Sequence, residues 1–208
     1  MVTKKNGQKN MTSELKVFGT DGVRGKVGEY PMTVDFTSRL AGAAASVLAP
    51  QGGTVVVGKD TRISGYMFES ALEAALVASG LDVMLLGPFP TPGISFTTKD
   101  CNANFGVIIS ASHNSYEYNG LKILNSLGEK IDKRIEIDIE NQLSKDPITH
   151  TADTLGRATR NPDARGNYMN FISGIFTQPQ PLKKIKVVVD CSHGAAYKIA
   201  PRMLSALG

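Results

Sequence analysis

The chain has 208 residues, of which 41% are hydrophobic and 20% are charged. This is enough apolar material for one domain with a substantial core and part of another, and it excludes a fibrous or wholly disordered protein. The formal net charge is +4, but Lys4, Lys5 and Lys9 all lie in the first ten residues. The remaining basic residues are scattered and are not interleaved with aromatic residues, which argues against a nucleic-acid partner.

The N-terminal residues are polar, and we assign 1–13 to a flexible tail that takes no part in the fold. The sequence shows no signal peptide and no membrane span, so we expect no membrane partner. Its two cysteines, Cys101 and Cys191, are isolated and lack a metal-ligand spacing. Two such thiols are typical of a reduced, cytoplasmic protein.

Short apolar, β-rich runs alternate along the chain with segments of helical periodicity. The runs that predict strands are Leu15–Phe18, Thr54–Val57, Val83–Leu86, Phe105–Ser110 and Lys186–Asp190. Helices are predicted after Thr33 and after Ser64, because either side chain can cap a segment whose apolar residues share one face. The alternation predicts an α/β fold: a three-layer αβα domain with a mixed, mostly parallel sheet.

Two of these strands are continuously apolar, as expected for strands that helices bury on both faces. The loop Lys59-Asp60-Thr61-Arg62 follows the first, and Ser110-Ala111-Ser112-His113-Asn114 follows the second. Because the carboxyl ends of parallel strands meet at one edge of a sheet, we expect the two polar loops to converge on one crevice.

The C-terminal part predicts a domain boundary. A helix through Ile135, Ile139 and Leu143 is followed by a polar stretch, and we assign the first domain to 14–163. We interpret 164–208 as the incomplete start of a second α/β domain, with a helix over Tyr168–Phe176, the strand Lys186–Asp190 and a helix over Gly194–Leu207.

Two glycine-containing segments have the composition of anion sites. Phe18–Gly25 places three glycines around Arg24, whose guanidinium can donate a planar fork to phosphate oxygens. A tight turn with a surface arginine explains this octet equally well. Gly58–Arg62 lies between a strand and a helix start, where backbone amides often hold anions. There the favoured interpretation is a solvated turn in which Asp60 pairs with a neighbouring cation.

The loop around Ser112 presents a hydroxyl at a strand end, and His113 and Asn114 can donate to an incoming anion. Ser112 can therefore accept and return a phosphoryl group, although the pentapeptide alone fits a Ser/Asn-rich turn better. Lys122 returns to the same region on a short strand, either as a general acid–base or as a solvated amine. The sequence excludes a serine hydrolase, because Ser112 is not in Gly-x-Ser-x-Gly and His113 cannot readily turn back onto it. It also shows no metal site built from protein ligands alone.

Together, Phe18–Gly25, Gly58–Gly65, Pro88–Pro92 and Ile109–Lys122 resemble the motifs of the α-D-phosphohexomutase superfamily, most closely its phosphoglucosamine mutase branch. The resemblance runs from about Leu15 to the end of the chain. It implies interconversion of glucosamine 6-phosphate and glucosamine 1-phosphate, with a phosphorylated hexosamine as substrate. It also allows a homodimer.

By motif position, the resemblance implies that Ser112 is a phosphoserine. Ser112 would donate its phosphoryl group to the sugar, the bisphosphate would reorient, and the other phosphate would return. Mg²⁺ would bind partly through the Ser112 phosphate. Arg24 and His113 would contact the phosphoserine region, and Lys122 would assist proton transfer at the sugar hydroxyl. The chain departs from the family at Ser115, where proline is usual, and we expect a looser loop with the same donors and acceptors.

Family members also carry an Asp-Gly-Asp-Gly-Asp metal loop, a sugar-recognition loop and a C-terminal phosphate loop, and none of them occurs in these 208 residues. We therefore expect the chain alone to have negligible mutase activity. Two alternatives stay open. One is phosphoglucomutase or phosphomannomutase activity, because the motifs present handle phosphate and not the second carbon of the sugar. The other is a short phosphate-binding module without catalysis.

Overall fold

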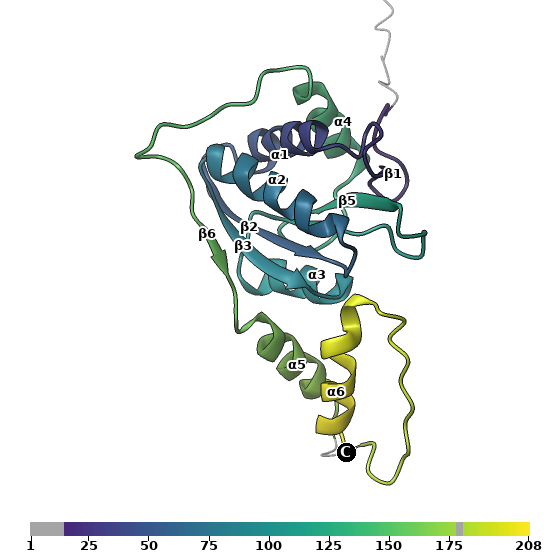
Figure 1. Cartoon of the computed structure of the whole chain (residues 1–208). Coiled ribbons are helices and arrows are strands. Elements are labelled where there is room, and N and C mark those ends of the chain that lie inside the picture. Colours follow the sequence, from purple (N-terminus) through teal and green to yellow (C-terminus); the bar gives the residue numbers. More distant parts are fainter. Residues whose placement is uncertain (1–14, 178–180) are drawn as a thin grey trace, which may run out of the picture.

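A six-stranded sheet forms the centre of the molecule in the computed structural model, which describes residues 15–177 and 181–208 (Figure 1). Its strand order is β1-β5-β4-β2-β3-β6. The strands are β1 (Val23–Lys26), β2 (Gly53–Lys59), β3 (Leu81–Pro88), β4 (Phe105–Ile109), β5 (Tyr118–Leu124) and β6 (Ala158–Arg160). β2 pairs in parallel with β3 and β4, and β3 with β6, whereas β5 is antiparallel to both β1 and β4. The predicted mixed, mostly parallel sheet is thus confirmed.

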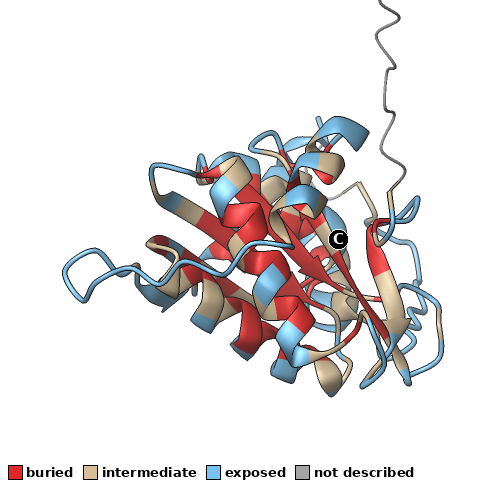
Figure 2. Ribbon diagram, turned by 90° about the horizontal axis from the view of Figure 1, so that it is seen from above, coloured by how far each residue is buried: buried red, intermediate tan, exposed pale blue. Residues whose placement is uncertain are grey.

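Helices cover both faces of this sheet. The described helices are α1 (Val34–Leu48), α2 (Ser64–Ala78), α3 (Thr91–Asp100), α4 (Lys133–Gln142), α5 (Ala164–Gly174), the 3₁₀ turn η1 (Ala195–Lys198) and α6 (Ala200–Ala206). α1, α2 and α4 supply the core on one face, and α3, α5 and α6 supply the core on the other. Figure 2 shows the buried residues concentrated on the strands and on the helix faces turned toward them. None of the described helices is long and apolar enough to cross a membrane.

The valines of β2 show why its continuous apolar run indicates burial on both faces. Val55 and Val57 belong to the core under α1 and α2, whereas Val56 belongs to the core under α3. All three are completely buried. Each contributes about 1.5–3 kcal/mol by leaving water, so a polar residue at any of them would weaken one of the two layers.

The predicted helix caps have different outcomes. Thr33 caps α1 as expected, since its Oγ1 accepts a hydrogen bond from the Phe36 amide at 3.2 Å. The expectation for Ser64 is wrong: α2 follows Ile63 without a side-chain cap. The hydroxyl of Ser64 instead accepts from Asn119 Nδ2 at 2.9 Å, which ties α2 to β5.

The predicted strand Leu15–Phe18 is absent. The amides of Lys16, Val17 and Phe18 donate to the carboxylate of Glu140 on α4, at 2.8–3.1 Å. A helix side chain therefore accepts the hydrogen bonds that a neighbouring strand would otherwise accept. The first strand, β1, begins later, at Val23 in the glycine-rich octet, and ends at Lys26.

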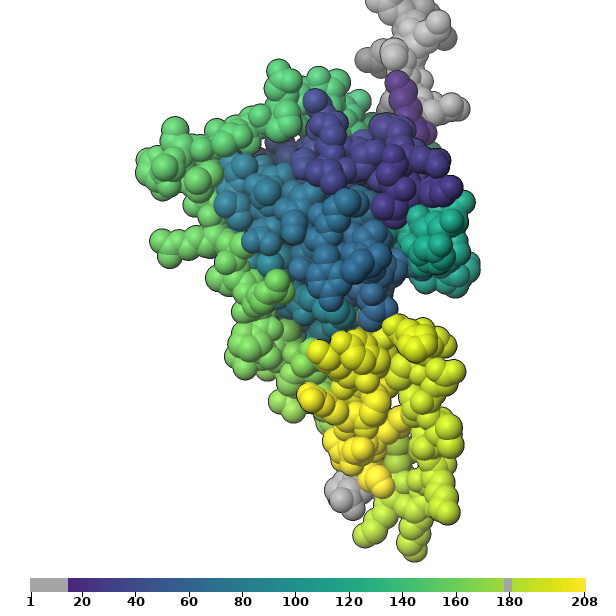
Figure 3. Space-filling model, viewed as in Figure 1, coloured from purple at the N-terminus to yellow at the C-terminus, as the bar shows by residue number. Residues whose placement is uncertain are grey.

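The C-terminal residues form a projection below the body of the molecule (Figure 3). α5 packs on α3, where the rings of Phe96 and Phe171 stack with centroids 4.6 Å apart. The predicted strand Lys186–Asp190 is wrong: the segment is exposed, and no described residue pairs with it in a sheet. The predicted helix Gly194–Leu207 is divided into η1 and α6, because Pro201 starts a new helix and cannot continue an old one.

Candidate active site

The loops that follow β2 and β4 converge at the carboxyl ends of these strands, as the sequence predicts. They border a cavity of about 590 Å³. Its lining includes Asp60–Ile63 from the first loop, Ser110, Ser112, Asn114 and Tyr116 from the second, and Ser192–Ala195 from the segment before η1. Three stretches that are far apart in the sequence therefore surround one space.

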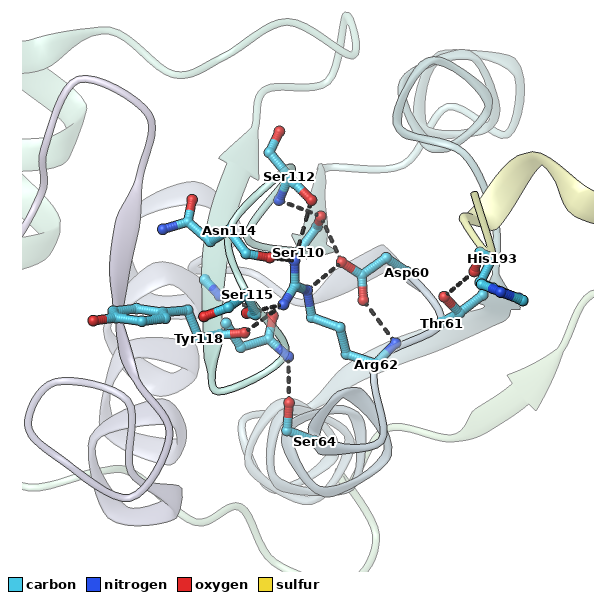
Figure 4. Close-up of polar contacts among 12 residues, drawn as sticks. Asp60, Thr61, Arg62, Ser64, Ser110, Ser112, Asn114, Ser115, Tyr118 and His193 are labelled. Atoms are coloured by element: carbon cyan, nitrogen blue, oxygen red, sulfur yellow. Dashed lines mark hydrogen bonds and ion pairs between the residues drawn. The ribbon is translucent and has the colours of Figure 1, made fainter. Parts of the chain in front are cut away.

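Ser112 is exposed in this cavity and has a φ of 59°, in the left-handed region. Serine seldom adopts this conformation, and such backbone strain is concentrated at functional sites. The Ser112 amide donates to Ser110 Oγ at 3.0 Å, while its own side chain points away from the Arg62 guanidinium (Figure 4). The hydroxyl is therefore held toward solvent and not packed in the core.

Arg62 reaches across from the first loop to the second. Its guanidinium donates to the main-chain oxygens of Ser112, Asn114, Ser115 and Tyr118, and its Nε pairs with Asp60 Oδ2 at 3.0 Å (Figure 4). Asp60 Oδ2 also accepts from Ser110 Oγ at 2.8 Å. The predicted pairing of Asp60 with a neighbouring cation is confirmed. The pair is largely buried, since the side chains of Asp60 and Arg62 are only 17% and 12% exposed, whereas Thr61 between them is exposed.

Lys59 lies in the same predicted anion loop but faces away from the cavity. Its side chain is 1% exposed, and Nζ contacts Glu69 Oε1 at 2.9 Å beneath the ring of Tyr66. Because successive residues of a strand point to opposite faces, Lys59 enters the α2 layer while Asp60 reaches the crevice. Lys59 is therefore a core residue and not an anion ligand.

Lys122 lies on β5, next to β4, and Arg24 lies on β1, the edge strand beyond β5. The two side chains share one carboxylate. Asp21 forms an ion pair with Arg24 and another with Lys122 Nζ at 2.7 Å. The hydrogen bond from Lys122 is the main cause that lowers the pKa of Asp21 below its usual value, and the charges of Lys122 and Arg24 act in the same direction. Sequence reasoning did not single out Asp21, although it lies in the octet that contains Arg24.

The close approach of the three strands depends on Gly120. It pairs with Arg24 on β1, and its carbonyl accepts from the Ser110 amide at 2.9 Å. A Cβ at this position would lie 2.8 Å from Arg24 Cγ and 2.9 Å from the Ser110 oxygen. Because Gly120 has no side chain, Arg24 can lie close to Ser110, where the Ser112 loop begins.

Of the four predicted catalytic residues, only Ser112 lines the cavity. Arg24 and Lys122 are joined through Asp21 on the neighbouring strands, and His113 is exposed at the loop tip. Their roles stay predictions. The structure adds His193, which lines the cavity and whose carbonyl accepts from Thr61 Oγ1 at 2.5 Å. A left-handed φ at both Ser192 and His193 has no signal in the sequence.

Within residues 15–177 and 181–208, no three His, Cys, Asp or Glu side chains lie close enough together to hold a metal ion. Both cysteines are free and partly buried. The side chains of the described residues therefore do not make a metal centre by themselves.

Comparison with known proteins identifies the family. The chain is 50% identical over 197 residues to the phosphoglucosamine mutase of Shewanella oneidensis. The aligned residues make up 94% of this chain and 44% of that protein. The enzyme of the same name from Vibrio campbellii is 50% identical over 199 residues, with 95% and 45% covered. The chain thus spans less than half the length of these relatives.

Solved structures share the fold. A phosphoglucomutase/phosphomannomutase family protein from Burkholderia thailandensis superposes with a TM-score of 0.76 at 26% identity, over 92% of this chain and 42% of that one. A Paramecium phosphoglucomutase superposes with a TM-score of 0.75 at 18% identity, over 92% and 41%, which shows the fold alone. Residues 15–149 match the family model for phosphoglucomutase/phosphomannomutase, alpha/beta/alpha domain I, and the chain therefore belongs to the phosphoglucomutase/phosphomannomutase family.

Proposed function

We propose that this protein is a phosphoglucosamine mutase that interconverts glucosamine 6-phosphate and glucosamine 1-phosphate, with Ser112 as its phosphoryl carrier. The observation that carries the proposal is the position of Ser112: exposed, left-handed and on a cavity of about 590 Å³ at the carboxyl ends of β2 and β4. The names of relatives at 50% identity favour the hexosamine substrate.

In the proposed reaction, the bond between phosphorus and Ser112 Oγ breaks as a sugar hydroxyl bonds to phosphorus. The bisphosphate then reorients, and its other phosphate returns to Ser112. The transferring group carries negative charge on its oxygens, so catalysis depends on positioning and on nearby cations. Arg24 and His113 would contact the phosphoserine. Lys122, which pairs with Asp21 as Arg24 does, would assist proton transfer at the sugar hydroxyl.

Mg²⁺ is the proposed metal, bound partly through the Ser112 phosphate, where it would neutralise charge on the transferred group. The described residues contain no group of three ligating side chains for it. No step of the proposed reaction is therefore assigned to the metal here.

The cytoplasm is the proposed compartment, since two free thiols suit a reducing environment. A homodimer, and the lack of nucleic-acid or membrane partners, stay predictions.

The first test measures the intact mass of the native protein in cell extracts. A native species much longer than 208 residues is expected, and a stable native chain ending near Gly208 would favour a phosphate-binding module. Purified 208-residue chain is expected to show negligible turnover, and robust conversion of glucosamine 6-phosphate by it would contradict this.

The second test uses the longest native form. Ser112→Ala is expected to lower the rate of interconversion by more than about 10³-fold, because the covalent carrier is lost. Ser70→Ala, which changes an exposed hydroxyl on α2, is the matched control and is expected to keep the wild-type rate. Phosphopeptide mass spectrometry should find the phosphate on Ser112. Ordinary turnover by Ser112→Ala would reject the proposal.

Phosphoglucomutase or phosphomannomutase activity is the second candidate, favoured by the name of the matched family model. Rates with the glucosamine, glucose and mannose phosphates distinguish the candidates. A preference for glucose or mannose would replace the hexosamine assignment while leaving the role of Ser112 intact.

A further inference from the structure

All three nitrogens of the Arg62 guanidinium are engaged within the protein. Nη2 donates to the carbonyls of Ser112 at 3.1 Å and Asn114 at 2.6 Å, and Nη1 donates to the carbonyls of Tyr118, at 3.0 Å, and Ser115. Nε donates to Asp60. A phosphate on Ser112 could engage this arginine only by displacing these acceptors, so Arg62 is occupied with the shape of the loop.

We propose that Arg62 is the positioning residue of the phosphoryl carrier: it binds four carbonyls of the loop and so holds Ser112 in the conformation that presents its hydroxyl to the cavity. The four carbonyls are those of Ser112, Asn114, Ser115 and Tyr118. The proposal rests on the proposed role of Ser112. It separates two kinds of cation at the site, since Arg24 and Lys122 pair with the Asp21 side chain, whereas Arg62 donates to main-chain oxygens of the second loop as well as to Asp60.

The backbone of Ser112 is fixed from both sides by one connected network. Its carbonyl accepts from Arg62 Nη2 at 3.1 Å, and its amide donates to Ser110 Oγ at 3.0 Å. Ser110 Oγ in turn donates to Asp60 Oδ2 at 2.8 Å, the oxygen that accepts from Arg62 Nε. Such a network can maintain a φ of 59°, which a serine does not keep without support.

The chemistry of the side chain explains why this position requires an arginine. A guanidinium is a rigid planar fork with five N–H donors, whereas an ammonium has three donors around a point charge. Lysine at this position cannot serve four carbonyls and a carboxylate together. We therefore expect Arg62→Lys to retain the charge but release part of the loop.

The first experiment tests the loop on the 208-residue chain by limited proteolysis with chymotrypsin. Tyr116 lies within the held segment and is 80% exposed. Arg62→Ala should raise the rate of cleavage after Tyr116 by about tenfold or more, with Arg62→Lys intermediate, while cleavage elsewhere stays unchanged. The matched controls are Arg39→Ala and Arg39→Lys, since Arg39 pairs with Asp35 in a half-exposed position on α1. They should leave the cleavage rate after Tyr116 unchanged.

Added guanidinium ion should slow the cleavage of Arg62→Ala after Tyr116, by refilling the vacated site, and should leave Arg39→Ala unaffected. If Arg62→Ala is cleaved at all sites alike, it is unfolded, and Arg62→Lys and Asp60→Asn then serve as the readout. Native cleavage rates after Tyr116 in the variants that fold would overturn the proposal.

The second experiment measures sugar-phosphate turnover by the longest native form. Arg62→Lys should lower kcat by about tenfold or more with KM changed by less than about threefold, because the carrier and not the sugar is misplaced. A raised KM with unchanged kcat would show that Arg62 binds substrate, and would overturn the proposal. Faster cleavage after Tyr116 together with an absence of phosphate on Ser112 would instead refute the proposed function while the loop assignment stands.

Discussion

The buried ion pair beside the first loop allows a quantitative prediction. Lys59 Nζ and Glu69 Oε1 are 2.9 Å apart, and the two side chains are 1% and 5% exposed. Lys59→Met would leave the Glu69 carboxylate in the core with Arg160, 4.0 Å away and 72% exposed, as the nearest remaining cation. Loss of one partner of a buried pair costs about 3–5 kcal/mol. For a chain of this length that corresponds to a fall in Tm of roughly 6–20 °C.

The assay is urea unfolding, followed by circular dichroism, of the wild type, Lys59→Met, Glu69→Leu and the double variant. Each single change should lower the free energy of unfolding by about 3–5 kcal/mol. The double variant should lose far less than the sum, because both charges leave the core together. Lys26→Met is the matched control, since its partner Glu29 is 3.6 Å away and both side chains are exposed. It should cost less than about 1 kcal/mol.

Two results would refute this reasoning. One is a loss below about 1 kcal/mol for Lys59→Met, the value expected of a surface pair. The other is a double variant whose loss equals the sum of the single losses, which would show that the two charges do not interact.

Three further predictions concern stability. Gly120→Ala should cost about 1–3 kcal/mol in urea unfolding, because the new Cβ would lie 2.8 Å from a main-chain oxygen, whereas Gly166→Ala has open space and should cost nothing. Because the pKa of Asp21 is lowered in the folded state, its ion pairs stabilise the fold above about pH 4, and this stabilisation is lost as the pH falls through the folded-state pKa. Asp21→Asn should therefore reduce the dependence of the unfolding free energy on pH in the acid range. An unchanged dependence would contradict this. Thr33→Ala should lower the unfolding free energy by about 1 kcal/mol through loss of the α1 cap, and an unchanged value would show that the cap contributes nothing.

Features of the fold that depend on local pattern were predictable from the sequence. The apolar runs of β2 and β4, and the cap of α1, need only neighbouring residues for their interpretation. Two of the errors lie where a distant side chain binds a backbone or hydroxyl group. Glu140 binds the amides of residues 16–18 from more than 120 positions away, and Asn119 donates to Ser64.

The same distinction holds for the candidate site. The convergence of the two loops follows from strand direction, and the Ser112 hydroxyl lies at a strand end as expected. The contacts of Arg62 with the second loop could not be predicted, because the acceptors there are main-chain oxygens, which have no sequence signature. The ion pair between Asp21 and Lys122 could not be predicted either, because it depends on the pairing of β1 with β5.

Every amino acid, proline included, carries the same carbonyl oxygen. The contacts of Arg62 with the loop use only such oxygens, so they do not depend on which side chains the loop displays. Ser115, where the family resemblance leads us to expect proline, binds Arg62 through its main-chain oxygen. Substitutions at 114–118 should therefore change the side chains that the loop displays while the contacts of Arg62 with its backbone remain.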